Sequence, residues 1–314
     1  MERVLDPARI EAFAERAIAR IRLPDRRQAF SRRAARLRQL SASERAGEGG
    51  AIGDYLRLMA VLADAQQSAL GSFTAARPNA EALRLASTHG MPPAHAAGLT
   101  REPSWRGILG ELCSSVLESG ELPAAVRETC ERLRGASAAP LEAQADALLG
   151  GRVVELDPAA APFLMGALQV YWLGLATQFT PKEIKPLEVH GVCPVCGTLP
   201  VASVVRVDKG SCGNRYLHCA LCATEWHMVR ITCSCCQETK DLTYHSIEGG
   251  SPAVRAESCG SCRGYRKILY QEKDPGVEPV ADDLASLALD VLMGMEGYHR
   301  LSGNPLLWLE LAAH

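Results

Sequence analysis

Four Cys-x-x-Cys units lie in the second half of this sequence, and they constrain its fold more than any other feature. The units are Cys193 and Cys196, Cys219 and Cys222, Cys233 and Cys236, and Cys259 and Cys262. Each cysteine of the first two units has a counterpart 40 positions later, and 22 residues separate the two units within each copy. The segment is therefore an internal tandem repeat that supplies four thiols per copy.

This spacing is typical of a metal site made only of thiolates. A Cys-x-x-Cys unit on a tight turn directs two sulfurs toward one point, and a second unit carried by a β-hairpin completes a tetrahedron. Pro194 and Gly197 suit such a turn, because proline fixes φ and glycine tolerates a positive φ. We expect two metal ions per chain, one bound by the first four cysteines and one by the last four. A cross-braced arrangement is the less favoured alternative.

Disulfides and a thioredoxin-like redox pair explain the same cysteines less well. The N-terminal residues MERVLDPARI do not lead into a secretory apolar region. We therefore expect a cytoplasmic protein, and disulfides are rare in that reducing compartment. A thioredoxin-like motif would need a βαβ pattern around the unit, and the sequence has none. Zinc and a single rubredoxin-type iron both suit four thiolates, and the spacing does not distinguish between them.

A closed four-thiolate site leaves no coordination position for water or substrate, so it is predicted to stabilise the fold. No Gly-rich phosphate loop, nucleophile elbow or His-Glu-x-x-His helix is present. We therefore expect no enzyme. Of the remaining cysteines, Cys212 and Cys235 are interpreted as turn thiols, and Cys113 and Cys130 as buried in helices.

Much of the remaining chain has helical periodicity. Apolar residues recur at helical spacing in 10–21, 54–70, 104–120 and 280–297, and we interpret Asp54 as the N-cap of the second segment. Residues 159–179 carry no charge but include several polar residues, which favours a buried core helix over a membrane span. No membrane span is expected.

The predicted fold is α+β and multidomain. An all-α N-terminal domain is followed by two tandem rubredoxin-like (zinc-ribbon) metal modules and a C-terminal helix that packs on the rest. The predicted boundaries are 1–187 for the helical domain, 188–231 and 232–272 for the modules, and 273–314 for the C-terminal helical tail. Within the modules, residues 201–219 and 242–259 each predict a strand, a turn and a strand.

The charge distribution gives little support for a nucleic-acid partner. The whole chain has a net charge of −2, and residues 189–272 hold nine Lys or Arg against seven Asp or Glu, a net of +2. Residues 20–38 are locally basic, with eight arginines and one aspartate. A solvated helix face is the first interpretation of this segment, and a docking face for an acidic partner is the second.

Histidines near the thiols are expected to pack or to hydrogen-bond around the ligands; they are His218, His227 and His245.

Three functions are compatible with a helical body that carries two closed metal modules. The first is a binding or chaperone protein that recognises another polypeptide. The second is nucleic-acid binding by zinc ribbons, which the weak local charge disfavours. The third is electron transfer by rubredoxin-type iron, which requires iron in the native protein and a reversible potential.

Several segments resemble the FdhE family of formate dehydrogenase accessory proteins, and together they extend over nearly the whole chain. The segments are VCPVCGTLP (192–200), RYLHCALCATEWHMVR (215–230), ESCGSCRGYRKILYQEKDP (257–275), VADDLASLALD (280–290), GDYLRLMAVLADAQ (53–66) and GYHRLSGNP (297–305). The resemblance is most specific in the C-terminal half. Cys235 departs from the family pattern as an additional cysteine within the third unit.

The resemblance implies a cytoplasmic assembly factor that is needed for active respiratory formate dehydrogenase. The implied partner is the molybdenum- or tungsten-containing catalytic subunit, which is exported by the twin-arginine route and would be bound before export. The implied metal ligands are the same eight cysteines of the four units. The family's association with rubredoxin-like iron sites favours iron over zinc. The residues leave a homodimer open as the assembly state.

Overall fold

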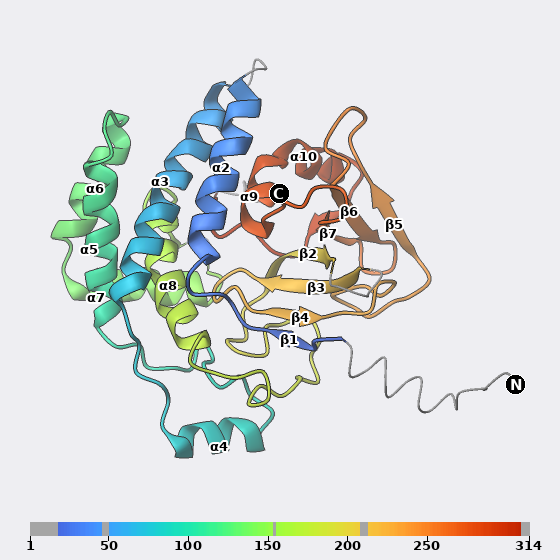
Figure 1. Cartoon of the computed structure of the whole chain (residues 1–314), viewed down its shortest axis with the longest axis horizontal. Coiled ribbons are helices and arrows are strands. Elements are labelled where there is room, and N and C mark those ends of the chain that lie inside the picture. Colours follow the sequence, from blue (N-terminus) through green and yellow to red (C-terminus); the bar gives the residue numbers. More distant parts are fainter. Residues whose placement is uncertain (1–17, 46–49, 153–154, 208–212, 309–314) are drawn as a thin grey trace, which may run out of the picture.

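In the computed structural model, the helices of the N-terminal part lie on one side of the molecule, and the strands lie on the other side together with the C-terminal helices (Figure 1). The structure describes residues 18–45, 50–152, 155–207 and 213–308. The helices of the N-terminal part are α2 (Ala29–Arg45), α3 (Gly50–Ser72), α4 (Ala80–Thr88), α5 (Ser104–Leu117), α6 (Ala124–Gly135), α7 (Ala138–Leu149) and α8 (Ala161–Ala176). This arrangement agrees with the predicted helical N-terminal region followed by a strand-rich region.

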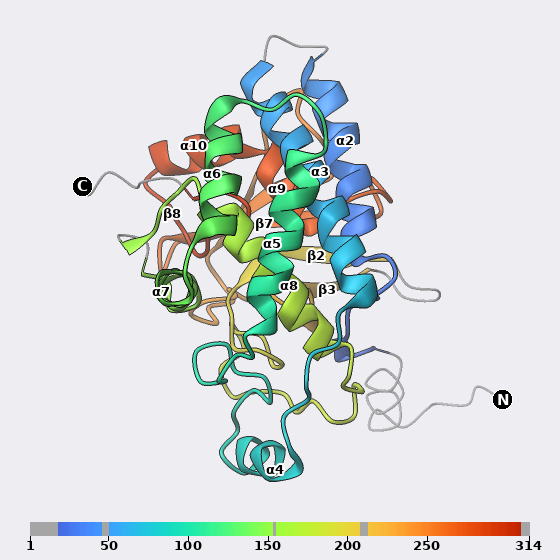
Figure 2. The same ribbon diagram turned by 90° about the vertical axis from the view of Figure 1, so that its left-hand side faces the viewer.

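Helix α8 is the centre of the helical side. All of its residues are buried, and α3, α5 and α7 pack against it (Figure 2). The carboxylate of Asp157 accepts hydrogen bonds from the backbone amides of Ala159 and Ala160, in the turn that leads into the helix. The prediction of a buried core helix within 159–179 is confirmed. Among the described residues, no helix combines the length and the apolar character that crossing a membrane requires.

Two predictions for the N-terminal helices differ from the structure. Residues 10–17 of the predicted stripe 10–21 lie outside the described residues, but Ile18 lies in a bend and Ile21 belongs to strand β1 (Ile21–Arg22). Ile21 is paired with Trp226 of a neighbouring strand, so sheet pairing overrides its helical spacing. Asp54 is not an N-cap, because α3 begins at Gly50 and Asp54 pairs with Arg57 on the same helix.

One mixed sheet forms the other side of the molecule. Its remaining strands are β2 (Pro200–Arg206), β3 (Asn214–Cys219), β4 (Glu225–His227), β5 (Leu242–His245), β6 (Val254–Cys259), β7 (Gly264–Tyr270) and β8 (His299–Arg300). Within the described part of the chain the order is β1-β4-β3-β2-β7-β6-β5, and β8 pairs with β7. The strands predicted within 201–219 and 242–259 are confirmed as β2 and β3 and as β5 and β6, whereas residues 208–212 of the first predicted turn lie outside the described residues.

The tandem repeat of the sequence is visible in the strand order. Strands β2, β3 and β4 form one antiparallel meander, and β5, β6 and β7 form its counterpart. A parallel pairing of β2 with β7 joins the two meanders, with Ser203 opposite Ile268. The two zinc-ribbon modules therefore share a single sheet. The division at 187/188, 231/232 and 272/273 stays a prediction.

The C-terminal segment forms two helices where the sequence predicted one over 280–297. These are α9 (Pro279–Ala285) and α10 (Leu287–Met295). The chain bends at Ser286, whose hydroxyl donates to the carbonyl of Asp282 at 2.7 Å. Because α10 changes direction there, the predicted apolar stripe does not continue into the core. Val291 and Met295 of α10 are 64% and 78% exposed.

Helix α2 joins the helical side to α9 through two buried arginines. Arg33 Nε lies 3.1 Å from Glu278 Oε1, and Arg36 Nη2 lies 2.6 Å from Asp282 Oδ1 and 2.7 Å from Asp274 Oδ2. Arg33 and Arg36 are only 2% and 6% exposed. The first interpretation of the basic segment as a solvated face is therefore wrong for these two residues. Their acidic partners belong to the same chain.

Candidate metal centres

The structure gathers the eight cysteines of the repeat into two clusters. The first cluster holds Cys193, Cys196, Cys219 and Cys222, and the second holds Cys233, Cys236, Cys259 and Cys262. Within each cluster the four Sγ atoms lie within 4.8 Å of one another. Each cluster uses one copy of the repeat, so the grouping is sequential rather than cross-braced.

The sulfur separations match a tetrahedral thiolate site. The measured Sγ–Sγ distances are 3.5 Å for Cys193–Cys222, 3.4 Å for Cys196–Cys219, 3.8 Å for Cys233–Cys262 and 3.6 Å for Cys236–Cys259. Four sulfurs bound at about 2.3 Å to one tetrahedral ion lie about 3.8 Å apart. Sulfurs of a disulfide lie about 2.0 Å apart. The donor set and its spacing fit one ion in each cluster, and the two clusters support two metal ions per chain.

A left-handed residue follows each of the four units. The residues are Gly197 (φ 76°), Ala223 (φ 57°), Gln237 (φ 63°) and Arg263 (φ 56°). Only the first is glycine, and a Cβ there would lie 2.9 Å from the His95 ring. The other three hold a conformation that costs of order 1–3 kcal/mol for such residues. Ligation by the neighbouring cysteine would offset that cost.

Backbone amides point at the sulfurs inside the turns. The N–H groups of Leu221 and Cys222 donate to Cys219 Sγ at 3.3 and 3.4 Å, and the N–H group of Cys235 donates to Cys233 Sγ at 3.4 Å. Hydrogen bonds of this kind favour the thiolate over the thiol. These backbone hydrogen bonds therefore stabilise the thiolate forms of Cys219 and Cys233.

Burial makes the first cluster dependent on a cation. Burial, reinforced by the neighbouring thiols, raises the pKa of Cys193 and of Cys219 well above the usual range. Four thiolates cannot share this space without a positive charge at their centre, because like charges in a low dielectric repel strongly. A metal cation bound by the four cysteines would supply that charge and would favour their thiolate forms.

The two clusters differ in their exposure to solvent. All four cysteines of the first cluster are buried. In the second cluster Cys236 is exposed and Cys262 is half-buried, whereas Cys233 and Cys259 are buried. The repeat in the sequence therefore does not produce equivalent surroundings.

The helical side holds the first cluster by direct hydrogen bonds. The backbone amides of Ala94 and Ala96 donate to the carbonyls of Val195 and Cys196 at 2.9 and 2.8 Å. The side-chain amide of Gln169, on α8, donates to the carbonyl of Ala220 at 2.7 Å. Both Cys-x-x-Cys turns of this cluster are thus attached to the helical body.

Gln169 is a structural residue that the sequence reasoning noted only as an interruption of an apolar run. Its Oε1 accepts hydrogen bonds from Arg33 Nη1 at 3.2 Å and from Gln66 Nε2 at 2.9 Å. The signal in the sequence was a lone amide inside a buried helix, because such a group must find hydrogen-bond partners. The identity of those partners was not visible in the periodicity.

Arg215 connects the two modules and was also missed as a structural residue. It is fully buried on β3, and its guanidinium donates to Glu257 Oε1 at 2.7 Å and to the carbonyl of Thr232 at 3.0 Å. Thr232 directly precedes the third Cys-x-x-Cys unit, and Glu257 precedes the fourth. One side chain therefore links the first module to both units of the second.

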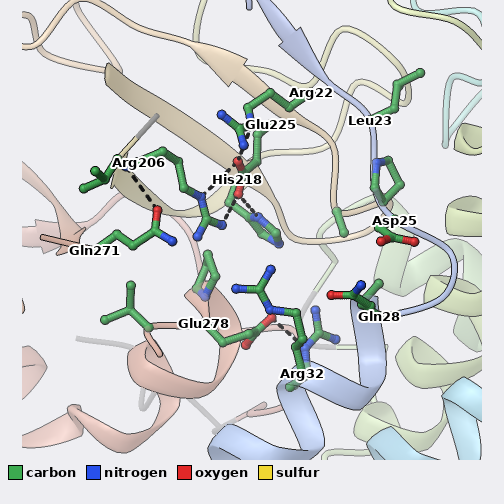
Figure 3. Close-up of a pocket in the computed structure, with 17 residues that line it drawn as sticks. Arg22, Leu23, Asp25, Gln28, Arg32, Arg206, His218, Glu225, Gln271 and Glu278 are labelled. Carbon is green, nitrogen blue, oxygen red and sulfur yellow. Dashed lines mark hydrogen bonds and ion pairs between the residues drawn. The ribbon is translucent and has the colours of Figure 1, made fainter. Parts of the chain in front are cut away.

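His218 pairs with a carboxylate beside the first cluster. Its Nδ1 lies 3.0 Å from Glu225 Oε1, and Arg206 also binds Glu225 (Figure 3). Burial alone would raise the pKa of Glu225, but Arg206 and His218 hold it well below its usual range. These residues line a polar pocket of about 260 Å³, with Gln28 and Arg32 on its opposite side (Figure 3).

The other two histidines near the thiols also pack or hydrogen-bond. The His227 ring lies edge-on to Tyr216, with 5.9 Å between the ring centroids, and His245 Nε2 lies 2.7 Å from Ser258 Oγ. In the described part of the chain, the two metal-like clusters contain cysteines alone. All three histidines thus pack or hydrogen-bond, as expected.

Three of the remaining cysteines, Cys113, Cys130 and Cys235, belong to neither cluster. Cys113 and Cys130 are buried in α5 and α6, as predicted. Cys235 is exposed in the third unit. Cys212 lies outside the described residues. The extra thiol of the third unit therefore points to solvent, while Cys233 and Cys236 keep the repeat spacing.

Comparisons with known proteins cover most of the described chain. Three domain models of one family match: FdhE, N-terminal (residues 18–188), FdhE, central domain (192–230), and FdhE, C-terminal domain (231–307). A protein FdhE homolog of Cronobacter sakazakii is 42% identical over 286 residues, covering 91% of this chain and 90% of that protein. A protein FdhE homolog of Edwardsiella ictaluri is 43% identical over 292 residues, covering 93% and 92%.

A solved structure gives the same result. The crystal structure of the FdhE protein from Pseudomonas aeruginosa superposes with a TM-score of 0.82 at 41% sequence identity, covering 92% of this chain and 98% of that one. The resemblance inferred from the sequence motifs is confirmed. From its domain models, its relatives and its fold, this chain belongs to the FdhE family.

Proposed function

We propose that this protein binds the immature catalytic subunit of a formate dehydrogenase in the cytoplasm, before that subunit is exported by the twin-arginine route. Family membership supports the accessory role for formate dehydrogenase. The observation that carries the proposal is the pair of closed four-thiolate clusters on one shared sheet. A closed cluster offers no free coordination position for a substrate. It cross-links the two turns that bind the ion, and so it makes the surrounding surface rigid.

The proposal includes the eight clustered cysteines as ligands of two metal ions. Iron is favoured over zinc, on the strength of the resemblance to the family and not of the spacing. When bound, each ion supplies fixed cross-links between two turns and so contributes directly to folding. The protein acts without catalysis of its own.

A second candidate function is electron transfer through iron in the second cluster. The exposure of Cys236 favours it, because a redox centre must approach its partner closely. This function requires iron and a reversible potential in the isolated protein. A zinc-filled protein, or iron without a reversible potential, excludes it.

Co-purification with the metal-free catalytic subunit tests the main proposal. Tagged wild-type protein should retain the subunit, and the variant Cys193→Ser/Cys196→Ser should lose it because the first cluster cannot form. Cys235→Ser is the matched control, since Cys235 is an exposed cysteine outside both clusters. Unchanged binding by the double variant, with undiminished formate dehydrogenase activity in the cell, would contradict the proposal.

A further inference from the structure

A groove with an apolar floor and a basic rim lies between α4 and the segment that leads into the first cluster. Its floor includes Leu83, Met91 and Leu187, and its volume is about 380 Å³. We call this feature the α4 groove. Leu187 and Pro194 also line a second cavity of about 300 Å³, which includes Ile21 of β1.

The floor of the α4 groove leaves apolar side chains open to water. Met91 is 47% exposed, and Val189 and Val229, which line the adjoining cavity, are each 62% exposed. Contiguous exposed apolar surface rimmed by polar groups is typical of a protein interaction site. Pro194 stands between the first two cysteine ligands, so the first cluster fixes part of this floor.

Helix α4 has little packing of its own. None of its residues is buried, and it projects from the end of the helical side (Figure 2). Leu85 of this helix is 53% exposed. A short helix gains most of its stability from packing an apolar face, so a partner in the groove would supply contacts that α4 lacks.

The rim of the α4 groove carries unpaired positive charge. Among the described residues, the side chains of Arg84, Lys182 and Lys185 form no hydrogen bond or ion pair, although the chain as a whole is acidic. The acidic residue in the described lining of the two cavities is Glu183, and it already pairs with Arg77. This excess attracts a negatively charged partner.

The lining favours a polypeptide over a nucleic acid. Binding of single strands relies on exposed aromatic rings that stack on bases. The aromatic side chains here, Phe179 and Trp226, are only 5% and 6% exposed. Aliphatic side chains and prolines make up the accessible floor, which suits the apolar side chains of a peptide.

We propose that the α4 groove binds an extended segment of the client protein that carries apolar side chains between acidic ones. The inference rests on the proposed function for the identity of the client. Apolar side chains of the segment contact the floor, and its carboxylates pair with the rim cations. The first metal cluster holds the floor in place through Pro194.

Fluorescence anisotropy with defined peptides tests the α4 groove directly. The probe is a labelled dodecapeptide of four Glu-Leu-Ser repeats, and four Lys-Leu-Ser repeats give the charge control. The groove variant is Arg84→Glu/Lys182→Glu/Lys185→Glu. The matched variant makes the same charge change at exposed positions elsewhere, Arg127→Glu/Lys240→Glu/Lys273→Glu. The metal content and the circular dichroism of each variant are compared with those of the wild type to confirm that it is folded.

The expected result has two parts. The wild type and the matched variant bind the acidic peptide at least about tenfold more tightly than the lysine peptide, and the preference weakens as salt increases. The groove variant loses that preference. Equal binding of the acidic peptide by the groove variant and the wild type would overturn the inference. Preference for a labelled dodecanucleotide, lost in the groove variant, would also overturn it, as would a homodimer that this variant dissociates.

Co-purification of the formate dehydrogenase catalytic subunit separates this inference from the proposed function. If the wild type and the groove variant retain the subunit equally, the groove inference is wrong and the proposed function stands. If the wild type retains no subunit, the proposed function fails, and with it the identity of the client. The peptide measurement still decides what the groove binds in that case.

Discussion

At the scale of single residues, the C-terminal segment is held by a buried ion pair. Lys267 and Asp283 have fully buried side chains, with 3.5 Å between Nζ and Oδ1. Arg300 and Asn304 also donate to the Asp283 carboxylate. Burial alone would raise the pKa of Asp283, but Lys267 and Arg300 lower it below its ordinary value.

Replacing this carboxylate should destabilise the protein strongly. We expect Asp283→Asn to lower the free energy of unfolding by about 3–5 kcal/mol, because Lys267 and Arg300 lose one of the two carboxylates that they share and keep only Asp290. Urea denaturation followed by circular dichroism measures the change. Asp64→Asn is the control, since Asp64 pairs with Arg38 at the surface. A loss no larger than that of the control would contradict the assigned role.

The same residue predicts a pH dependence. The folded pKa of Asp283 is lowered, whereas an unfolded aspartate titrates at about 3.9. The unfolded chain therefore binds more protons as the pH falls, and the contribution of Asp283 is complete above about pH 5 and is lost below it. The difference in unfolding free energy between wild type and Asp283→Asn should shrink from pH 5 to pH 3.5. A difference that grows over this range would show that the sign is wrong.

At the residue level, the spacing of the cysteines predicted which of them come together. The cysteines of the four units were chosen by the repeat, and each copy forms one cluster in the structure. Gln169 and Arg33 could not be assigned in this way, because they bond across 136 residues of sequence. Local periodicity contains no signal for such long-range partners.

Among the secondary-structure elements, the two meanders share a sequence repeat but have different neighbours in the structure. The first is covered by the helical side, whereas the second ends at β5, an edge strand of the sheet in the described chain. This difference explains why the first cluster is buried and the second has an exposed cysteine. Sequence similarity between the copies says nothing about what packs on each of them.

The two bound metals should therefore leave at different rates. A chelator should remove one ion at least about tenfold faster than the other, because opening an exposed cluster costs less free energy than opening a buried one. Absorbance of the chelator complex follows the release. Cys236→Ser should abolish the fast phase, and Cys196→Ser the slow phase. A single common rate, or a fast phase that persists in Cys236→Ser, would contradict this difference.

Prediction of the elements failed where tertiary contacts redirect the chain. The apolar stripe of 280–297 is continuous, but Ser286 bends the segment and α10 exposes Val291 and Met295. The bend brings Asp290 Oδ2 within 2.6 Å of Lys267 Nζ on β7. The prediction from periodicity alone had no means to include this pairing. The hairpins were predictable because strand and turn residues are adjacent in sequence.

In the molecule as a whole, two arginines of α2 connect the helical body, the first metal module and the C-terminal segment through hydrogen bonds and ion pairs. Arg36 binds Asp282 and Asp274 of the C-terminal segment, and Arg33 binds Glu278 there and Gln169 on α8. Gln169 in turn donates to the carbonyl of Ala220, in the turn between Cys219 and Cys222 of the first cluster. The helical body, the first metal module and the C-terminal helices therefore form a continuous polar network inside the core.

Breaking this network should affect the stability of the whole molecule. We expect Arg36→Ala to lower the free energy of unfolding by about 3 kcal/mol, because it leaves Asp282 buried without a counter-charge. Asp282→Ala should lower the free energy of unfolding less in the Arg36→Ala variant than in the wild type, since the two residues are coupled. Thermal and urea unfolding of the four proteins of this cycle give the coupling. Additive effects would contradict a direct interaction.

The sequence patterns did not predict that the two modules share one sheet. The parallel pairing of β2 with β7 connects residues about 65 positions apart, and neither strand carries a mark of that partner. The predicted fold class is nonetheless confirmed, because helical periodicity and the cysteine repeat act locally. The family resemblance supplied the functional expectation, which the fold alone does not provide.

The central claim is that the eight cysteines hold two metal ions in separate closed clusters. Elemental analysis of protein purified without oxygen, with metal counted per chain, tests it most directly. We expect two ions per chain in the wild type and one in Cys193→Ser/Cys196→Ser. Fewer than one ion per chain in the wild type, with the clustered cysteines reacting as free thiols or paired as disulfides, would contradict it.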